Sequence, residues 1–232
     1  MQRRAALSLL LPLLFLPAVQ AQSTPDARQI LAKAKSAAGG TAWDSIKTIY
    51  LRGQAKISGI DTNLEDWTDL TTLRHVERAA KGPIKAARGF DGKTFWQQLP
   101  PAQQVTTKTD NVISFAYRRS FTFFFPERWE AKFTYQGTRQ EQERTFYLVE
   151  VSPKNGIPFV MWIDSTTYLL NRTVSSSGVT FTYANYRIVN GVKLPFLIQG
   201  PDQILSFEQA QFNLPVTDDL FLVPTLPAPR RR

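Results

Sequence analysis

Cysteine is absent from the 232-residue chain, and histidine occurs once. Without cysteine the chain cannot form disulfides, thiol nucleophiles or thiolate metal sites. A single histidine disfavours a zinc or iron site and a Ser-His-Asp triad. The sequence also lacks a Gly-x-Ser-x-Gly elbow, a P-loop and a dinucleotide-binding fingerprint. We therefore expect no metal and no cofactor, and we predict that the protein is not an enzyme.

Long apolar runs are scarce, and the one that stands out lies at the N-terminus. It extends from Ala5 to Pro17, follows the basic start Met1-Gln2-Arg3-Arg4, and precedes Val19-Gln20-Ala21, whose outer residues are small. A membrane span needs about 20 apolar residues, and this run is shorter and contains two prolines. The three-part pattern predicts that residues 1–21 are a secretory signal peptide. We expect the protein in the periplasm of a Gram-negative-type envelope, with an extracellular location as second choice.

The rest of the chain has no further run long enough to cross a membrane, so we expect a soluble, monomeric protein. Residues 22–224 are predicted to form one domain, because a chain of about 200 residues buries roughly 70% of its unfolded surface and needs no disulfides. The Pro-rich and Arg-rich tail 225–232 is predicted to be disordered. Although the formal net charge is +9, the basic residues are scattered and the chain is exported, so we expect no nucleic-acid partner.

Two segments have helical patterns. Ser23-Thr24-Pro25-Asp26 is a helix start, apolar residues follow at helical spacing, and Gly39-Gly40 marks the end. A short helical turn is expected over residues 41–46. Residues 110–124 predict a second helix, with Asp110 as its cap and an apolar face. A last short helical turn is expected near residues 218–221.

The remaining segments alternate with the period of two that is typical of β-strands. Candidate strands cover residues 49–57, 60–70, 72–80, 84–90, 94–99, 103–108, 129–136, 143–151, 157–164, 167–175, 178–188, 192–199 and 203–213. Turn signals such as Ser58-Gly59, Asp91-Gly92 and Asn190-Gly191 separate them. We predict a mainly β fold with a few helices: an open, unclosed antiparallel β-barrel of about ten or eleven strands, with helices covering its concave side.

Several of the late strands are apolar on both faces. In residues 157–163, for example, Phe159, Met161 and Ile163 alternate with Val160 and Trp162. An antiparallel sheet with one face in water should alternate apolar and polar residues instead. We therefore expect both faces of these strands to be covered, one of them by helices.

Short motifs in a fixed order resemble a known family. They are Ala37-Ala38-Gly39-Gly40-Thr41-Ala42-Trp43-Asp44, the segment from Gly89 to Gln98, Phe125-Pro126-Glu127-Arg128-Trp129, the segment from Pro158 to Asp164, and the segment from Tyr186 to Pro195. Residues 26–224 resemble the outer-membrane lipoprotein-sorting-like (LolA-like) superfamily, and more closely the module that precedes aspartyl-protease-like domains in some bacterial proteins.

The resemblance implies an unclosed β-barrel plugged by helices, with a hollow that holds acyl chains in the carrier proteins. The chain has no Asp-Thr-Gly or Asp-Ser-Gly motif, so no protease activity follows from the resemblance. We transfer no lipid-binding residue of the carriers to this sequence. The resemblance therefore implies a fold and a class of ligand but no particular site residue.

Few polar residues are candidates for chemistry. His75 lies in a candidate strand, where a lone histidine is usually exposed or hydrogen-bonded. Glu65 and Asp66 form a carboxylate cluster with Asp69, but alternation places Asp66 on the opposite face from the other two. Asp91 and Asp164 lie in turns, where aspartate usually accepts hydrogen bonds from its own backbone.

Aromatic residues are abundant, and they either form an ordinary core or line a hydrophobic pocket with residues 121–125 as its lid. For a pocket, the candidate ligand-binding residues are Trp67, Phe90, Trp96, Phe115, Phe121, Phe123, Phe124, Phe159 and Trp162. Arg118 and Arg119 are candidates for contact with an anionic headgroup, unless they extend along the surface.

Three functions remain open at this stage. The first is a periplasmic binding or carrier protein for a hydrophobic ligand, such as a lipid or a lipoprotein acyl chain. The second is an interaction module that binds an envelope protein through a sheet edge or the Phe-rich segment. The third, for which the sequence gives least support, is a hydrolase that uses Glu65 or Asp66.

Overall fold

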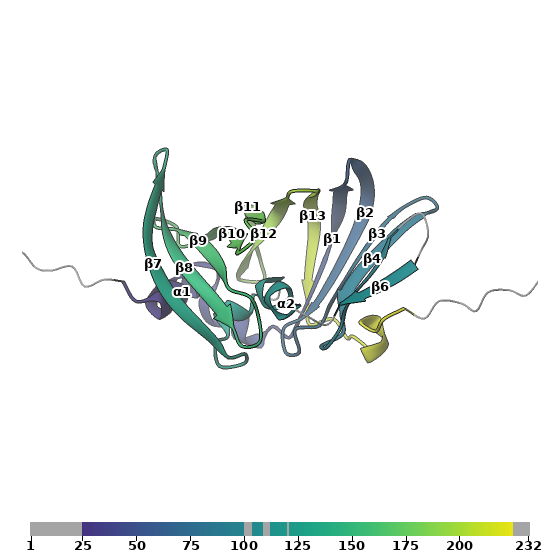
Figure 1. Cartoon of the computed structure of the whole chain (residues 1–232), viewed down its shortest axis with the longest axis horizontal. Helices are drawn as coiled ribbons and strands as arrows, with labels where there is room; N and C mark the ends of the chain where they lie inside the picture. The colour runs from purple at the N-terminus through teal and green to yellow at the C-terminus, as the bar shows by residue number, and fades with distance from the viewer. Residues whose placement is uncertain (1–24, 100–103, 109–111, 120, 225–232) are drawn as a thin grey trace, which may run out of the picture.

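Thirteen antiparallel strands form one curved sheet in the computed structural model, which describes residues 25–99, 104–108, 112–119 and 121–224 (Figure 1). The strands are β1 (Thr48–Ile57), β2 (Ile60–Asp69), β3 (His75–Lys81), β4 (Ile84–Phe90), β5 (Phe95–Leu99), β6 (Gln104–Lys108), β7 (Ala131–Glu141), β8 (Arg144–Pro153), β9 (Phe159–Asp164), β10 (Leu170–Ser175), β11 (Thr180–Val189), β12 (Val192–Gly200) and β13 (Gln203–Phe212). The helices are α1 (Ala27–Ala37) and α2 (Ile113–Arg119), with the short 3₁₀ helices η1 (Gly40–Ser45), η2 (Thr122–Phe124) and η3 (Asp218–Leu220). The predicted signal peptide and the predicted tail 225–232 lie outside the described residues.

The sheet consists of two meanders joined along one seam. Its strand order is β6-β5-β4-β3-β2-β1-β13-β12-β11-β10-β9-β8-β7, so β1 pairs with β13 and the other neighbours are consecutive in the chain. Because β6 and β7 stand at opposite ends of this order, the sheet is unclosed, as predicted. The predicted number of ten or eleven strands was wrong, since each of the thirteen candidate segments forms its own strand.

The predicted turns have the backbone that their sequences favour. Ser58 and Gly59 have φ angles of 48° and 82°, and Asn190 and Gly191 have φ angles of 47° and 81°. Two successive positive φ values are typical of a type I′ turn, whose twist matches that of the flanking strands. These hairpins therefore help to fix the register of β1 with β2 and of β11 with β12.

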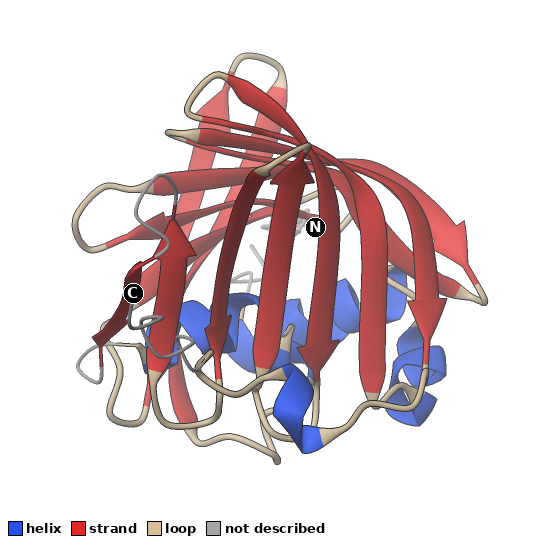
Figure 2. Cartoon of the chain, turned by 90° about the vertical axis from the view of Figure 1, so that its right-hand side faces the viewer, coloured by secondary structure: helices blue, strands red, loops and turns tan. Residues whose placement is uncertain are grey.

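The helices α1 and α2 lie within the curve of the sheet (Figures 1 and 2). Asp26, the last residue of the predicted helix start, caps α1 by accepting a hydrogen bond from the Arg28 backbone N–H at 3.3 Å. The apolar face of α1 packs beside Trp43, which is fully buried and donates its indole N–H to the Ala38 carbonyl at 2.9 Å. These contacts fix α1 against the concave face.

The predicted second helix is interrupted. The segment forms α2 and then η2, and Phe121 between them has a left-handed backbone with φ of 49°. Aromatic residues seldom adopt this conformation because the Cβ atom crowds the backbone. The predicted cap Asp110 lies outside the described residues.

The outer, convex face is covered only in places. Residues 214–224, here called the C-terminal strap, lie against β3 and β5, and Phe221 is fully buried beside Val76 and Trp96. The Arg172 guanidinium of β10 lies 4.5 Å from the ring of Trp162 on β9, which is half-buried. The expected cover is therefore complete only on the inner face of β9, where Phe159, Met161 and Ile163 are buried. On the outer face Val160 and Trp162 are half-buried, and Arg172 shields Trp162.

Candidate functional site

Charged side chains line up across three neighbouring strands on the concave face. Asp66 of β2 lies directly opposite Glu77 of β3, and Glu77 lies opposite Arg88 of β4. Both carboxylates are buried, with 4% and 3% of their surface exposed. Two like charges in adjacent cross-strand positions repel each other, so this row requires cations to be stable.

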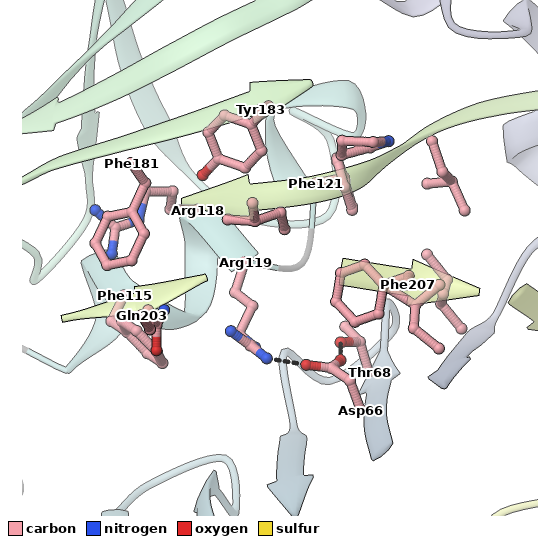
Figure 3. A pocket seen from close by; sticks show the side chains of 15 residues that line it. Asp66, Thr68, Phe115, Arg118, Arg119, Phe121, Phe181, Tyr183, Gln203 and Phe207 are labelled. Carbon is pink, nitrogen blue, oxygen red and sulfur yellow. Dashed lines mark hydrogen bonds and ion pairs between the residues drawn. The ribbon is translucent and has the colours of Figure 1, made fainter. Parts of the chain in front are cut away.

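Arg119 of α2 supplies one of these cations. Its guanidinium donates a hydrogen bond to Asp66 (Figure 3). It donates a second, of 2.6 Å, to Glu77. Arg88 forms the second pair with Glu77, at 2.8 Å, and also donates to the Gln203 side-chain oxygen. Burial lowers the pKa of Arg119 to about 10, which leaves it charged at neutral pH. Arg119 therefore ties α2 to the sheet.

Arg118, the preceding residue, has no acidic partner among the described residues. Its guanidinium lies 4.5 Å from the Phe181 ring centroid and 5.7 Å from that of Phe115, and makes no hydrogen bond or ion pair within the described residues. The side chain is half-buried, and burial lowers its pKa. Two consecutive arginines thus differ sharply in their surroundings.

Arg118 and Arg119 both border a small internal space, here called the arginine hollow. Its walls combine polar groups, including Asp66 and Tyr183, with apolar side chains of β1, β12 and β13, and its volume is about 50 Å³. That volume accommodates about one or two water molecules. The hollow is therefore a small space with one cationic and one apolar side (Figure 3).

Phe121 separates the arginine hollow from a second, smaller space of about 10 Å³ among Phe123, Met161 and Tyr186. Its ring contacts Trp43 at 5.3 Å between centroids. The strained backbone of Phe121 thus lies at the boundary between the two spaces. Unusual backbone conformations of this kind often cluster at functional sites.

His75 lies in the same half of the concave face, where its ring is stacked on Phe90 and tilted against Phe115. It is completely buried, and neither ring nitrogen has a hydrogen-bond partner among the described residues. Burial, aided by the charge of Arg88, lowers its pKa from 6.5 to about 3. The expectation that His75 is exposed or hydrogen-bonded was wrong.

The structure brings together only part of the predicted pocket. Phe115, Phe121, Arg118 and Arg119 border the arginine hollow, and Phe123 and Phe124 border the space beyond Phe121. The other candidates are distributed over both faces. Phe90 packs with Leu73 and Val112, and Phe159 lies near Tyr117. Trp67 contacts Tyr50 with tilted rings, Trp96 lies under the strap and Trp162 packs on Phe146. The sequence did not indicate that Asp66, Glu77 and Arg88 would lie side by side. The register between β2, β3 and β4 brings them together, and the alternation within each strand does not determine that register.

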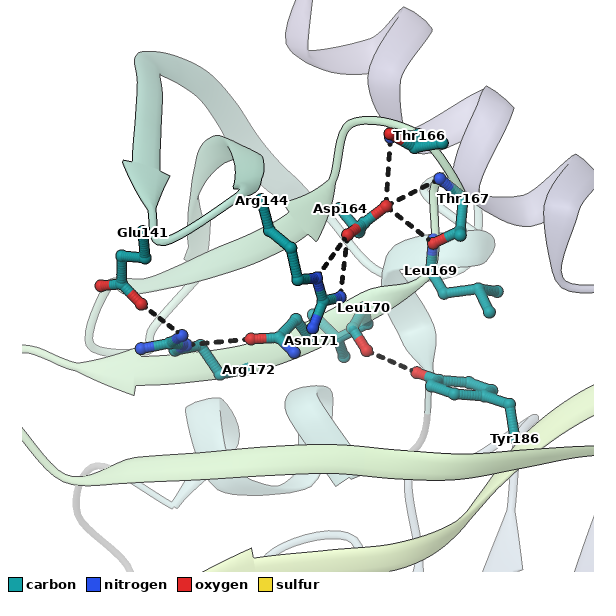
Figure 4. Close-up of polar contacts among 10 residues, drawn as sticks. All are labelled: Glu141, Arg144, Asp164, Thr166, Thr167, Leu169, Leu170, Asn171, Arg172 and Tyr186. Atoms are coloured by element: carbon teal, nitrogen blue, oxygen red, sulfur yellow. Dashed lines mark hydrogen bonds and ion pairs between the residues drawn. The ribbon is translucent and has the colours of Figure 1, made fainter.

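The remaining carboxylates have structural roles. Glu65 is exposed and accepts a hydrogen bond from the Tyr50 hydroxyl, whereas Asp66 lies on the opposite face, as the alternation predicted. The two therefore cannot act together on one substrate. Asp164 accepts hydrogen bonds from the backbone N–H groups of Thr166 and Thr167 and pairs with Arg144 at 2.8 Å (Figure 4).

Motifs that carry the family resemblance meet in space. The Lys193 backbone N–H donates to the Ala38 carbonyl at 2.8 Å. A Cβ atom at Gly39 would lie 2.5 Å from the Gly191 carbonyl oxygen, so the close approach of α1 to the β11–β12 hairpin requires glycine. These motifs define packing and turns rather than a ligand contact.

The fold and the hollow define a class: an open antiparallel sheet that curves around helices and leaves a small internal space between them. Among solved structures, this chain is similar to a DUF1329 family protein from Desulfovibrio piger, with 12% identity, a TM-score of 0.53, and coverage of 84% of this chain and 95% of that chain. It is also similar to an uncharacterized conserved protein from Thermus thermophilus, with 10% identity, a TM-score of 0.34, and coverage of 84% and 91%. MucB has 13% identity and a TM-score of 0.30, with 87% of this chain and 64% of MucB covered.

No protein-family model matches the chain, and no curated protein matches it. The likeness to the DUF1329 family protein shows the fold alone. Membership of the LolA-like superfamily stays a prediction. Within the described residues, no helix has both the length and the apolar character of a membrane span, and no group of three His, Asp or Glu side chains is placed to bind a metal.

Proposed function

We propose that this chain is an exported periplasmic binding or carrier protein that holds a hydrophobic ligand against the concave face of its sheet. The observation that supports this most is the apolar wall of the arginine hollow, which includes Leu51 of β1, Leu194 of β12 and Phe207 of β13. All three side chains are buried, and Phe121 and residues of α2 line the same hollow. Export is proposed from the N-terminal sequence pattern.

A ligand with an acyl chain needs more room than 50 Å³, so binding must displace aromatic side chains of the α2–η2 segment. This exchange is energetically feasible because one apolar surface replaces another on the same wall. Burial of a large apolar side chain stabilises by roughly 1.5–3 kcal/mol, and an acyl chain contributes about 0.8 kcal/mol for each buried methylene. Displacement of Phe121 also relieves its left-handed backbone, a strain of about 1–2 kcal/mol.

The test is native mass spectrometry of the protein from Gln22 onward, purified from an export-competent host without detergent. Additional mass that organic solvent releases as lipid would support the proposal, and the same spectrum reports whether the protein is a monomer, as predicted. Titration with the neutral fluorescent probe N-phenyl-1-naphthylamine is expected to show saturable binding at one site.

Variants locate the binding site. Phe121→Ala joins the two internal spaces and is expected to increase the affinity for the probe several-fold. Leu194→Glu places a charge in the apolar wall and is expected to abolish binding, whereas Ile188→Glu, at a residue that is 70% exposed, should leave binding unchanged. Equal binding by all three variants, or a protein that remains free of ligand and probe, would refute the proposal.

An interaction module for an envelope protein is the second candidate. The observation in its favour is that β7, with eleven residues, ends the strand order and has no partner strand on its outer side among the described residues. An exposed edge can pair with an extended segment of another protein. The Phe-rich segment does not offer a docking surface, because Phe123, Phe124 and Phe125 are buried. A stable complex with an envelope protein that forms equally well after lipid removal would favour this candidate.

A further inference from the structure

The contrast between Arg118 and Arg119 identifies the chemistry of the ligand, on the premise that the proposed binding function is correct. Arg119 is committed to Asp66 and Glu77 and stabilises the attachment of α2. Arg118 borders the same hollow, yet no carboxylate of the described residues pairs with it. A half-buried guanidinium without an anionic partner has lost part of its hydration without a compensating ion pair.

The local charges also leave an excess of one positive charge. Three guanidinium groups, those of Arg88, Arg118 and Arg119, stand against two carboxylates, those of Asp66 and Glu77. The two carboxylates are occupied by Arg88 and Arg119, so the unbalanced charge resides on Arg118. A negatively charged group in the hollow would restore neutrality.

The geometry of Arg118 suits recognition of such a group. The Phe181 ring lies 4.5 Å from the guanidinium carbon, and such ring contacts stabilise the cation while the N–H groups around its edge stay available as donors. These donors form a planar fork that matches the two oxygens of a carboxylate or a phosphate. The Tyr183 side chain lines the same hollow. The hollow is about the size of such a head, since it accommodates one or two water molecules.

We infer that the ligand is an amphiphile with an anionic head, a carboxylate or a phosphate, which binds Arg118 while its apolar tail lies along Leu51, Leu194 and Phe207. A cationic head would meet a like charge at this position. A neutral head would leave Arg118 unpaired. The charge of the head group therefore determines which class of ligand the hollow binds.

The experiment compares four ligands with the same twelve-carbon tail by isothermal titration calorimetry, each below its micellar concentration or, for dodecanol, its solubility limit. Dodecanoate and dodecyl phosphate are expected to bind about 10- to 100-fold more tightly than dodecanol, the range that a charge-assisted hydrogen bond supplies. Dodecyltrimethylammonium is expected to bind most weakly. Acetate and inorganic phosphate, which carry the head alone, are expected not to bind measurably.

Arg118→Met removes the charge and retains the apolar stem. This variant should bind dodecanoate and dodecanol with equal affinity, and its affinity for dodecanol should match that of the wild type. Arg118→Lys should restore part of the preference, and Arg187→Met, at an exposed arginine, should retain all of it. Urea unfolding of each variant verifies that the fold is intact, which we expect because Arg118 makes no ion pair within the described residues.

The outcomes separate this inference from the proposed function. If the wild type binds dodecanoate and dodecanol equally well, the anionic head is refuted and the hydrophobic binding function stands. If inorganic phosphate binds as tightly as dodecyl phosphate, the hollow is a site for free anions and the amphiphile is refuted. If none of the four ligands binds, both the inference and the proposed function are wrong.

Discussion

At the scale of single residues, His75 combines complete burial with two ring nitrogens that lack partners among the described residues. An apolar side chain of similar size avoids the desolvation that such a group requires. We predict that His75→Leu does not destabilise the protein at pH 7 and increases its free energy of unfolding by up to about 2 kcal/mol. Urea denaturation measures this, and a clear loss of stability would show that the imidazole has a partner in solution.

The same residue makes stability depend on pH. The pKa of His75 is about 3 in the folded protein and 6.5 in the unfolded chain. Below pH 6.5 the unfolded chain binds a proton that the folded protein does not, so stability decreases as the pH falls toward 3. Between pH 7 and pH 5 the wild type should lose about 2 kcal/mol more than His75→Leu, at about 1.36 kcal/mol per pH unit. If the free energy of unfolding changes equally with pH in the two proteins, His75 is not the cause of the pH dependence.

Arg119 is the residue on which the buried charges depend. In Arg119→Met, Asp66 loses its ion pair and Glu77 loses one of its two. Removal of one partner from a buried ion pair typically destabilises by about 3–5 kcal/mol. We expect a loss of this size in chemical denaturation, and no measurable loss for Arg187→Met. Addition of Asp66→Asn alone should recover most of the lost stability, because Glu77 keeps its ion pair with Arg88 and no uncompensated carboxylate then remains buried.

Sequence patterns predicted the local roles of polar residues better than their long-range contacts. Asp91 and Asp164 accept hydrogen bonds from backbone N–H groups within three residues, and short-range turn chemistry made that predictable. The ion pairs of Arg119 connect residues 42 and 53 positions apart. They depend on the register of β2 and β3 and on the position of α2, which alternation alone does not determine.

At the scale of elements, the C-terminal strap explains why Trp96 is not part of the hollow. Trp96 points to the outer face and donates its indole N–H to the Phe221 carbonyl at 3.0 Å. Arg74 fastens the same segment through Asp218 at 2.6 Å. The sequence predicted a helical turn near this position but gave no sign of the strand face that it covers, because the strap is short and irregular.

The strap should contribute substantially to stability. Phe221→Ala leaves a cavity between Val76 and Trp96, and replacement of a buried phenylalanine by alanine typically destabilises by about 3–5 kcal/mol. Limited proteolysis of this variant should cut within residues 214–224 before the rest of the chain. Leu222→Ala is the matched control, since Leu222 is 56% exposed, and its effect should remain within about 0.5 kcal/mol. Equal effects of the two substitutions would argue against the strap as a fixed element.

At the scale of the whole molecule, the seam between β1 and β13 joins the two meanders. Gly53 of β1 lies so close to β13 that an added Cβ atom would lie 2.7 Å from the Phe207 Cα. We predict that Gly53→Ala destabilises the protein by about 1–3 kcal/mol, the usual effect of overpacking. Gln54→Ala, at the next and exposed residue, should have little effect. If the free energy of unfolding of Gly53→Ala equals that of the wild type, the two strands of the seam can move apart without loss of stability.

The sequence predicted the fold class and the positions of the strands along the chain, because hairpin turns and alternation are local signals. It did not predict which strands pair at the seam, since β1 and β13 are separated by most of the chain. The strand number was underestimated although every segment had been recognised. An unclosed sheet can add strands at its ends, so the width of the sheet was not constrained by closure.

The crossing from β6 to β7 has a mechanical consequence. These strands are consecutive in the chain but lie at opposite ends of the sheet, so the connection that carries α2 and η2 runs from one arm of the sheet to the other (Figure 1). This connection links the two ends of the curved sheet, and its length limits how far these ends can move apart. A ligand that displaces the connection would therefore change the curvature of the whole sheet. The distance between β6 and β7 would then increase with the size of the ligand.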